Sequence, residues 1–283
     1  INKNHVRNIP LYSWGEPFLN PEIDEFISIL KTKGFKAELS SNFIIEPRID
    51  VNSLKNLNCI TFSLSGFTQK SDGKIHGADL KKTLTNFELL YTKLRRVSPR
   101  TKILITWHRY RFNEIEFWDA FRYFNRPGVR FRPVVAYVND LPEFIDFITD
   151  RIEPERKKQI SEDIFVEHIL KMLEYHKARS KGYQCPGSNS LVIDEEGRLL
   201  LCCGVTRIDS KHVFGNILEM SADEIIDNRN SDKLCDVCIS SGLAKWFYTP
   251  ECESGLELKW PTGGGSDSLK FWLKCNLSMS KAA

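Results

Sequence analysis

The sequence lacks any long apolar run, and it shows no secretory signal before its first strand-like segment. A membrane-spanning helix needs roughly 18 or more consecutive apolar residues, so we expect no membrane contact. Without a secretory signal we expect a cytoplasmic protein. The formal net charge is only +3, which indicates no nucleic-acid partner.

Several common catalytic signatures are also missing. The chain has no Gly-x4-Gly-Lys-Ser/Thr loop, no Gly-x-Gly-x2-Gly segment after a strand and no His-Glu-x2-His helix. Its composition, 41% hydrophobic and 27% charged over 283 residues, is typical of a globular chain with room for one large or two ordinary domains.

Strand-like and helical segments alternate over residues 1–150. The apolar strand-like runs have little strict alternation, as expected when both faces of a sheet are covered. This order predicts an α/β fold with a parallel sheet, either open or barrel-like. The expected strands are 9–14, 36–40, 59–64, 102–107 and 129–138, and the expected helices are 21–33, 79–96, 113–125 and 141–150.

Polar residues follow four of these strands, at 15–16, 40–42, 63–66 and 106–108. In parallel α/β folds, ligands bind at the carboxyl ends of the strands. Glu16 lies between Gly15 and Pro17, which both stop a strand, so its carboxylate belongs either to a solvated turn or to a ligand site. The four polar strand ends together favour a ligand site.

A different pattern begins after residue 150. A charged helical segment over 151–181 leads to a small cysteine-bearing region over 182–283, with a hairpin at 190–201 and a capping box at Ser221. Seven of the eight cysteines lie in this region, in the order Cys185, Cys202, Cys203, Cys235, Cys238, Cys252 and Cys275.

The cysteine spacing predicts a metal centre. A disulfide framework is not expected without a secretory signal. One hairpin end and a tight Cys-x2-Cys turn can converge on one centre, and four thiolates suit either zinc or an iron–sulfur cluster. Spacing alone leaves both open, and buried free thiols are a further alternative. Cys59 lies in a strand and is expected in the core.

Two stretches within residues 1–150 resemble the radical S-adenosylmethionine (SAM) enzymes. "LYSWGEPFLNPEIDEFISILKTKGFKAELSSNF" resembles their second and third strands, with the Gly-Glu-Pro motif at 15–17, and "ITFSLSGF" resembles their Ser-Leu-Asp-Gly motif, with Ser65 where Asp is usual. The resemblance implies a partial (β/α)6 TIM-like barrel over 1–150 that lacks its first βα unit. The Cys-x3-Cys-x2-Cys loop of the catalytic cluster normally lies upstream, so we expect an N-terminally truncated chain, inactive alone.

The C-terminal cysteines resemble the SPASM/twitch extension of the same enzymes. The shared pattern is Cys185-x11-Gly197-x4-Cys202, followed by Cys235-x2-Cys238. The resemblance implies an auxiliary [4Fe–4S] cluster held by Cys185, Cys202, Cys235 and Cys238, with Cys203 pointing away as a small buried hydrophobe or a bystander. Ala244 stands at one expected cysteine position, which fits the shorter twitch form.

The resemblance also implies a SAM site at the strand ends. Gly15, Glu16 and Pro17 would hold the amino group of the methionine moiety, since an ammonium needs acceptors. By position, Ser40, Ser41, Asn42, Ser63 and Ser65 would face the same pocket. No catalytic residue is identified.

The implied activity is that of a radical SAM oxidoreductase or modifying enzyme. The intact protein would cleave SAM reductively to a 5′-deoxyadenosyl radical, which abstracts a hydrogen from a peptide or small-molecule substrate. A flavodoxin or ferredoxin would serve as reductant. The alternative is a non-catalytic iron–sulfur or zinc binding module descended from such an enzyme.

Overall fold

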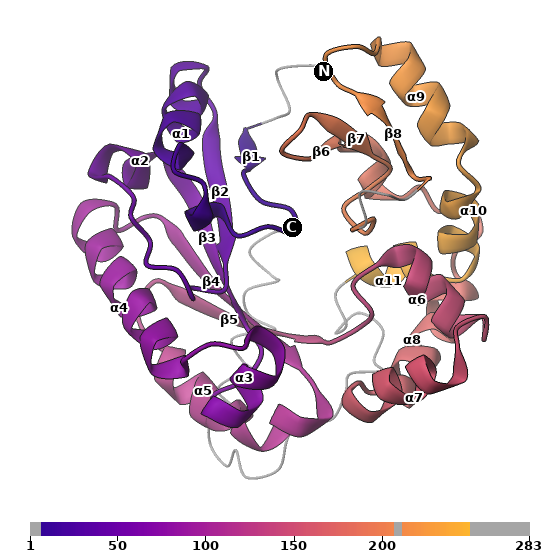
Figure 1. Cartoon of the computed structure of the whole chain (residues 1–283), viewed down its shortest axis with the longest axis horizontal. Helices are drawn as coiled ribbons and strands as arrows, with labels where there is room; N and C mark the ends of the chain where they lie inside the picture. The colour runs from indigo at the N-terminus through magenta and orange to yellow at the C-terminus, as the bar shows by residue number, and fades with distance from the viewer. Residues whose placement is uncertain (1–6, 207–210, 250–283) are drawn as a thin grey trace. The chain divides into compact units, whose positions relative to one another are not determined.

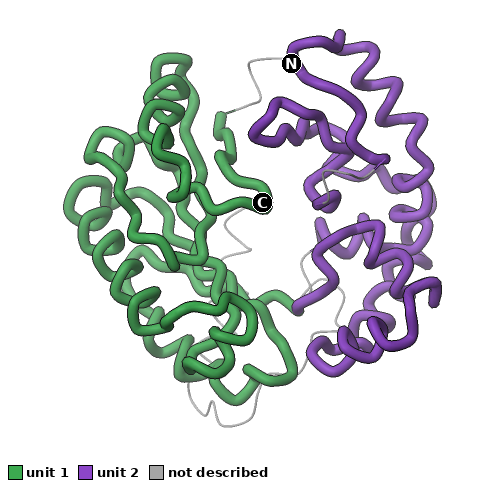
Figure 2. The backbone as a smooth tube through the Cα atoms, viewed as in Figure 1, with its two compact units in different colours: residues 1–135, 259–283 green, residues 136–258 purple. Residues whose placement is uncertain are grey.

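The computed structural model describes residues 7–206 and 211–249. The chain divides into two compact units, shown in different colours in Figure 2. The described part of the first unit is 7–135, and that of the second unit is 136–206 and 211–249.

The first unit is built on a parallel five-stranded sheet, which confirms the predicted α/β class. The strands pair in chain order, β1-β2-β3-β4-β5, and every pair is parallel. All the carboxyl ends therefore meet at one edge of the sheet. The strands are β1 (Asn8–Pro10), β2 (Lys36–Ser41), β3 (Leu57–Leu64), β4 (Lys102–Arg109) and β5 (Val129–Val135).

Helices connect these strands, and in Figure 1 α1, α2, α4 and α5 lie along one side of the sheet. Helix α4, predicted from the sequence over 79–96, begins after the Asp79 cap and buries Phe87, Leu90 and Leu94 along one face. The helical elements are η1 (Pro17–Leu19), α1 (Ile23–Thr32), α2 (Val51–Asn56), α3 (Gln69–His76), α4 (Leu80–Val97), η2 (Arg111–Glu116) and α5 (Phe117–Phe124).

Aromatic rings form the core between helices and sheet. Phe62 of β3 stacks on Phe87 of α4 with centroids 5.4 Å apart, and Phe87 meets Phe124 of α5 edge-on at 5.1 Å. Each of these rings is at most 1% exposed. Burying a Phe side chain stabilises a fold by about 1.5–3 kcal/mol. This cluster therefore holds the helices against the sheet whose strand ends carry the polar residues.

The first strand is shorter than predicted, and two helices were not predicted. β1 ends at Pro10 rather than Trp14, and Trp14 is 46% exposed, so the apolar run continues as an exposed loop rather than as strand. Helices α2 and α3 are short, with few apolar residues to mark a buried face. Their side-chain caps, Asp50 and Thr68, start them instead.

The second unit combines helices with a small antiparallel sheet, ordered β6-β7-β8. Its strands are β6 (Val192–Ile193), β7 (Arg198–Leu200) and β8 (Val213–Asn216). Its helical elements are α6 (Leu141–Ile148), α7 (Pro154–Asp163), α8 (Val166–Lys177), η3 (Pro186–Asn189), α9 (Ala222–Ser231), α10 (Lys233–Ser240) and α11 (Leu243–Tyr248). No helix among the described residues is long and apolar enough to cross a membrane.

Local predictions for this unit are confirmed in part. The hairpin forms, with Val192 opposite Leu200 and a positive φ of 80° at Gly197 in its turn. The capping box of Ser221 and Glu224 starts α9. The prediction of a single charged helix over 151–181 is wrong, because the buried Ile164 adopts an extended backbone that separates α7 from α8.

Candidate functional site

Glu16 joins two strand ends of the first unit. Its Oε1 accepts a hydrogen bond from the Phe18 backbone N–H at 3.1 Å, which starts the turn of η1. Its Oε2 accepts from the Ser41 hydroxyl at 3.0 Å and from the Asn42 N–H at 3.1 Å. Burial raises the pKa of the Glu16 carboxyl, and these three hydrogen bonds oppose that rise. A carboxylate has about four acceptor positions, so one remains on Oε1.

The turn after β2 is held in a costly conformation. Phe43 has a φ of +59°, which is rare for a bulky residue, and it is 1% exposed. The Ser41 hydroxyl accepts from the Phe43 N–H at 2.8 Å, and the Asn86 amide donates to the Phe43 carbonyl at 2.9 Å. This conformation lets Ser41 and Asn42 both donate to Glu16.

The neighbouring strand ends also carry polar side chains, and with Glu16 they form what we call the polar edge of the sheet. The hydroxyls of Ser40 on β2 and Ser63 on β3 lie 3.3 Å apart. Beyond them, Ser65 Oγ lies 3.5 Å from His108 Nδ1 at the end of β4. The Asn113 amide ties this corner by donating to the carbonyls of Ser65, at 2.7 Å, and His108, at 2.8 Å.

His108 is an uncharged member of this edge. Burial, with smaller contributions from His76 and Arg132, lowers the pKa of His108 to about 4. Its imidazole is therefore neutral near pH 7, so one ring nitrogen donates a hydrogen bond and the other accepts one. The sequence analysis predicted His108 at a strand end but did not assign it to the site. Its contact with Ser65, which lies 43 residues earlier in the chain, forms only in the folded protein.

In the structure, the predicted SAM-site residues form three separate sets of hydrogen-bond contacts. Glu16 meets Ser41 and Asn42, Ser40 meets Ser63, and the buried Ser65 meets His108 instead of either group. Gly15 is exposed with open space beside it, and Pro17 is buried at the first position of η1. Their role as SAM ligands stays a prediction.

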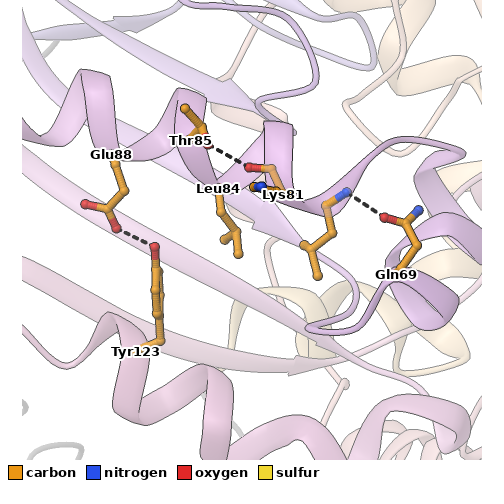
Figure 3. Close-up of a pocket in the computed structure, with 7 residues that line it drawn as sticks. Gln69, Lys81, Leu84, Thr85, Glu88 and Tyr123 are labelled. Atoms are coloured by element: carbon orange, nitrogen blue, oxygen red, sulfur yellow. Dashed lines mark hydrogen bonds between the residues drawn. The ribbon is translucent and has the colours of Figure 1, made fainter.

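A pocket of about 530 Å³ lies elsewhere on this unit, between α3, α4 and α5 (Figure 3). Its polar groups are already engaged with one another. The Tyr123 hydroxyl donates to Glu88 at 2.6 Å, and the Leu80 N–H donates to Gln69 at 3.0 Å. All the residues that line the pocket belong to helices, none is a predicted site residue, and we assign it no part in the site.

In the second unit, Cys238 lies within electrostatic range of the other three predicted metal-ligating cysteines. Cys185 precedes η3, Cys202 follows β7, and Cys235 and Cys238 lie on α10. Cys202 and Cys235 pack against the apolar cluster of Leu200, Leu201 and Val205. Three separate chain segments therefore supply these thiols.

The thiols interact electrostatically. Burial, followed by repulsion from Cys202, Cys185 and Cys235, raises the pKa of Cys238 to about 12. Burial also raises the pKa of Cys202 to about 11, and Cys203 and Cys235 add to the rise. Neighbouring thiolates repel one another, so these thiols are costly to ionise without a cation, and a bound metal would remove that cost.

Two local predictions about the cysteines are wrong. Cys235-x2-Cys238 is a helical segment rather than a tight turn, which still places both thiols on one helix face. Strand β7 ends at Leu200, and Cys202 and Cys203 lie in the turn that follows it. Cys203 is exposed and not a buried hydrophobe. It lies beside the other thiols, hydrogen-bonded to Tyr248.

The donor set fits an iron–sulfur cluster, which is commonly held by four cysteine thiolates. Among the residues described here, no three His, Cys, Asp or Glu side chains form a group that could hold a single metal ion. In a cluster each thiolate binds a different iron, which requires a wider spacing than ligands of one ion need. Cys252 and Cys275 lie outside the described residues.

A family match covers this region. Residues 185–253 match SPASM, an iron–sulfur cluster-binding domain. The match confirms the predicted SPASM-type region, and the matched residues include all four predicted cysteines. The shorter twitch form stays a prediction.

Solved structures similar to this chain include two of TYW1 and one of a histidine-tagged anSMEcpe. Archaeal TYW1 is 20% identical over 41% of this chain and 39% of its own, with a TM-score of 0.29. TYW1 with a lysine-pyruvate adduct bound is 16% identical over 67% and 54%, with a TM-score of 0.35. The tagged anSMEcpe, with bound AdoMet, is 16% identical over 98% and 81%, with a TM-score of 0.48. No curated protein sequence matches the chain.

Proposed function

We propose that this protein is a radical SAM enzyme whose C-terminal unit holds an auxiliary [4Fe–4S] cluster. The observation that carries the proposal is the gathering of Cys185, Cys202, Cys235 and Cys238 from three chain segments within the region that matches SPASM. When bound, SAM and the clusters supply the one-electron chemistry, and the chain binds and orients them.

The polar edge of the first unit is the proposed SAM site. Glu16 retains one acceptor position after its three hydrogen bonds, which suits an ammonium group. Ser40 and Ser63 offer hydroxyls on adjacent strands, which suit the hydroxyl or carboxylate groups of the same ligand. Gly15 and Pro17 shape the turn, and Asn42 and Ser65 complete the edge.

The substrate in this proposal is a peptide or a small metabolite, and the reductant is a flavodoxin- or ferredoxin-type carrier. The proposed reaction class is a hydrogen abstraction that modifies this substrate.

The test uses the full-length protein, reconstituted anaerobically with iron and sulfide and then incubated with SAM and dithionite. We expect 5′-deoxyadenosine and methionine, measured by mass spectrometry against a sample without iron. Bound iron without 5′-deoxyadenosine would contradict the enzymatic proposal and indicate a non-catalytic iron–sulfur module.

A further inference from the structure

Tyr248 lies beside the thiols of the second unit, although nothing in the sequence pattern marks it. It is the last residue of α11, and its hydroxyl forms a hydrogen bond with Cys203. Cys185 and Cys202 also lie within electrostatic range of this hydroxyl. One phenol therefore faces two proposed cluster ligands and the spare thiol.

Gly187 provides the space for this hydroxyl. A Cβ added at Gly187 would lie 2.7 Å from the Tyr248 hydroxyl oxygen and 3.3 Å from Cys185 Sγ. Any larger residue would displace the end of the tyrosine side chain. The hydroxyl and the Cys185 sulfur are thus both neighbours of one buried backbone position.

A separate element fixes that backbone position. Arg229 of α9 donates to the Gly187 carbonyl and to the Ser190 carbonyl, each at 2.6 Å. These two hydrogen bonds to charged nitrogen hold η3 in place and, with it, Cys185. The tyrosine and the thiol are therefore positioned by the fold rather than by a chance side-chain contact.

A hydroxyl donor in this position acts on the charge of an iron–sulfur site. Reduction adds negative charge to the cluster and its thiolates, and a hydrogen bond to sulfur stabilises that charge. A donor therefore raises the reduction potential. Tyr183 also lies within electrostatic range of Cys185, and Lys245 Nζ lies 5.6 Å from its ring centroid.

We propose that Tyr248, hydrogen-bonded to Cys203 and within electrostatic range of Cys185 and Cys202, is a positioning residue whose hydroxyl donates to the sulfur of the loaded iron–sulfur site and thereby raises its reduction potential. The proposal rests on the proposed function of this site. It assigns Gly187 the role of admitting the hydroxyl.

The experiment is a redox titration of the anaerobically reconstituted chain, followed by electron paramagnetic resonance. Tyr248→Phe keeps the ring and removes the donor, and we expect unchanged iron content with a more negative potential. A tenfold change in the one-electron equilibrium corresponds to a shift of about 59 mV, which is the size that we expect for one lost hydrogen bond. Tyr175→Phe, on α8 with Arg179 over its ring at 3.7 Å, is the matched control and should cause no shift.

A second variant tests the same geometry without changing the tyrosine. Gly187→Ala should push the hydroxyl aside and lower the potential in the same direction. Unchanged potentials in both variants would overturn the proposal, and so would loss of iron in Tyr248→Phe, because that result indicates a purely structural role. A wild-type chain that binds no iron would instead contradict the proposed function itself.

Discussion

The Ser41 hydroxyl donates a hydrogen bond to Glu16 Oε2 at 3.0 Å and so connects the end of β2 to the turn after β1. The same hydroxyl accepts from the Phe43 N–H at 2.8 Å, inside a turn with a positive φ. Glu16 therefore has a structural role besides the one proposed for it. Removing the Glu16 carboxylate should therefore lower the stability of the fold and weaken SAM binding.

The structural role predicts that Glu16→Ala destabilises the fold. The N–H groups of Phe18 and Asn42 and the Ser41 hydroxyl would lose their acceptor, and an unsatisfied buried donor costs about 1–3 kcal/mol. Urea unfolding of the chain should show this loss. Glu22→Ala is the control, since Glu22 is exposed and makes no side-chain cap. Equal stabilities of the two variants would contradict the role given to Glu16.

The proposed ligand role predicts weaker SAM binding by the same variant. We expect Glu16→Ala to cost roughly 1.5–3 kcal/mol of SAM affinity in the intact enzyme, as for a lost charge-assisted hydrogen bond. Iron bound by the C-terminal cysteines should stay constant. Calorimetric titration with SAM measures the effect, and an unchanged affinity would reduce Gly15-Glu16-Pro17 to a turn.

Asp72 in α3 predicts a pH dependence of stability. It is 1% exposed, and neither carboxyl oxygen has a partner among the described residues. Nearby Glu116 accepts from Phe67, Thr68 and Ser71 instead. Burial, and then repulsion from Glu116, raises the pKa of Asp72 from 3.8 to about 6.

Since the pKa of Asp72 is higher in the folded state, its contribution to stability is fully present below pH 3.8 and is lost as the pH rises through about 6. The free energy of unfolding should fall by roughly 2–3 kcal/mol across this window. Asp72→Asn should remove most of that fall in urea unfolding at a series of pH values. Asp119→Asn, at an exposed position, should retain it. A wild-type curve that is flat or rising after subtraction of the Asp72→Asn curve would show that Asp72 is not the cause.

The adjacent thiols Cys202 and Cys203 predict unequal effects on iron binding. Cys202 packs on the apolar cluster of its unit, whereas Cys203 is exposed and bonded to Tyr248. Cys202→Ser should lose most of the iron, and Cys203→Ser should keep it. Iron analysis and electron paramagnetic resonance of the reduced variants show which of the two thiols is the ligand. The reverse result would mean that the ligand is Cys203.

Sequence patterns predicted elements that bury a long apolar face. Strands β2 to β4 and helix α4 match the expected ranges closely, because apolar runs and one continuous stripe mark them. Helix α3 escaped prediction because it has few apolar residues and depends on the Thr68 cap.

The same distinction, between features that local sequence pattern marks and features that it does not, holds for the residues of the candidate sites. Glu16 and the four cysteines were predicted as site residues because motif spacing along the chain marks them. The contacts of Tyr248 and His108 were not, because they join residues far apart in sequence through turns. The Tyr248 hydroxyl and the Cys185 sulfur both approach the backbone of Gly187, which has no side chain to keep them away. Such close approaches depend on tertiary packing, which local pattern does not encode.

The most direct test of the central claim is the metal content of this chain after anaerobic purification and reconstitution. We predict a brown protein with about four iron atoms per chain and the reduced-state resonance of a [4Fe–4S] cluster. The variants at Cys185, Cys202, Cys235 and Cys238 should lose that iron, and the control Cys59→Ser in β3 should keep it. A colourless wild-type protein with one stoichiometric zinc ion would contradict the claim.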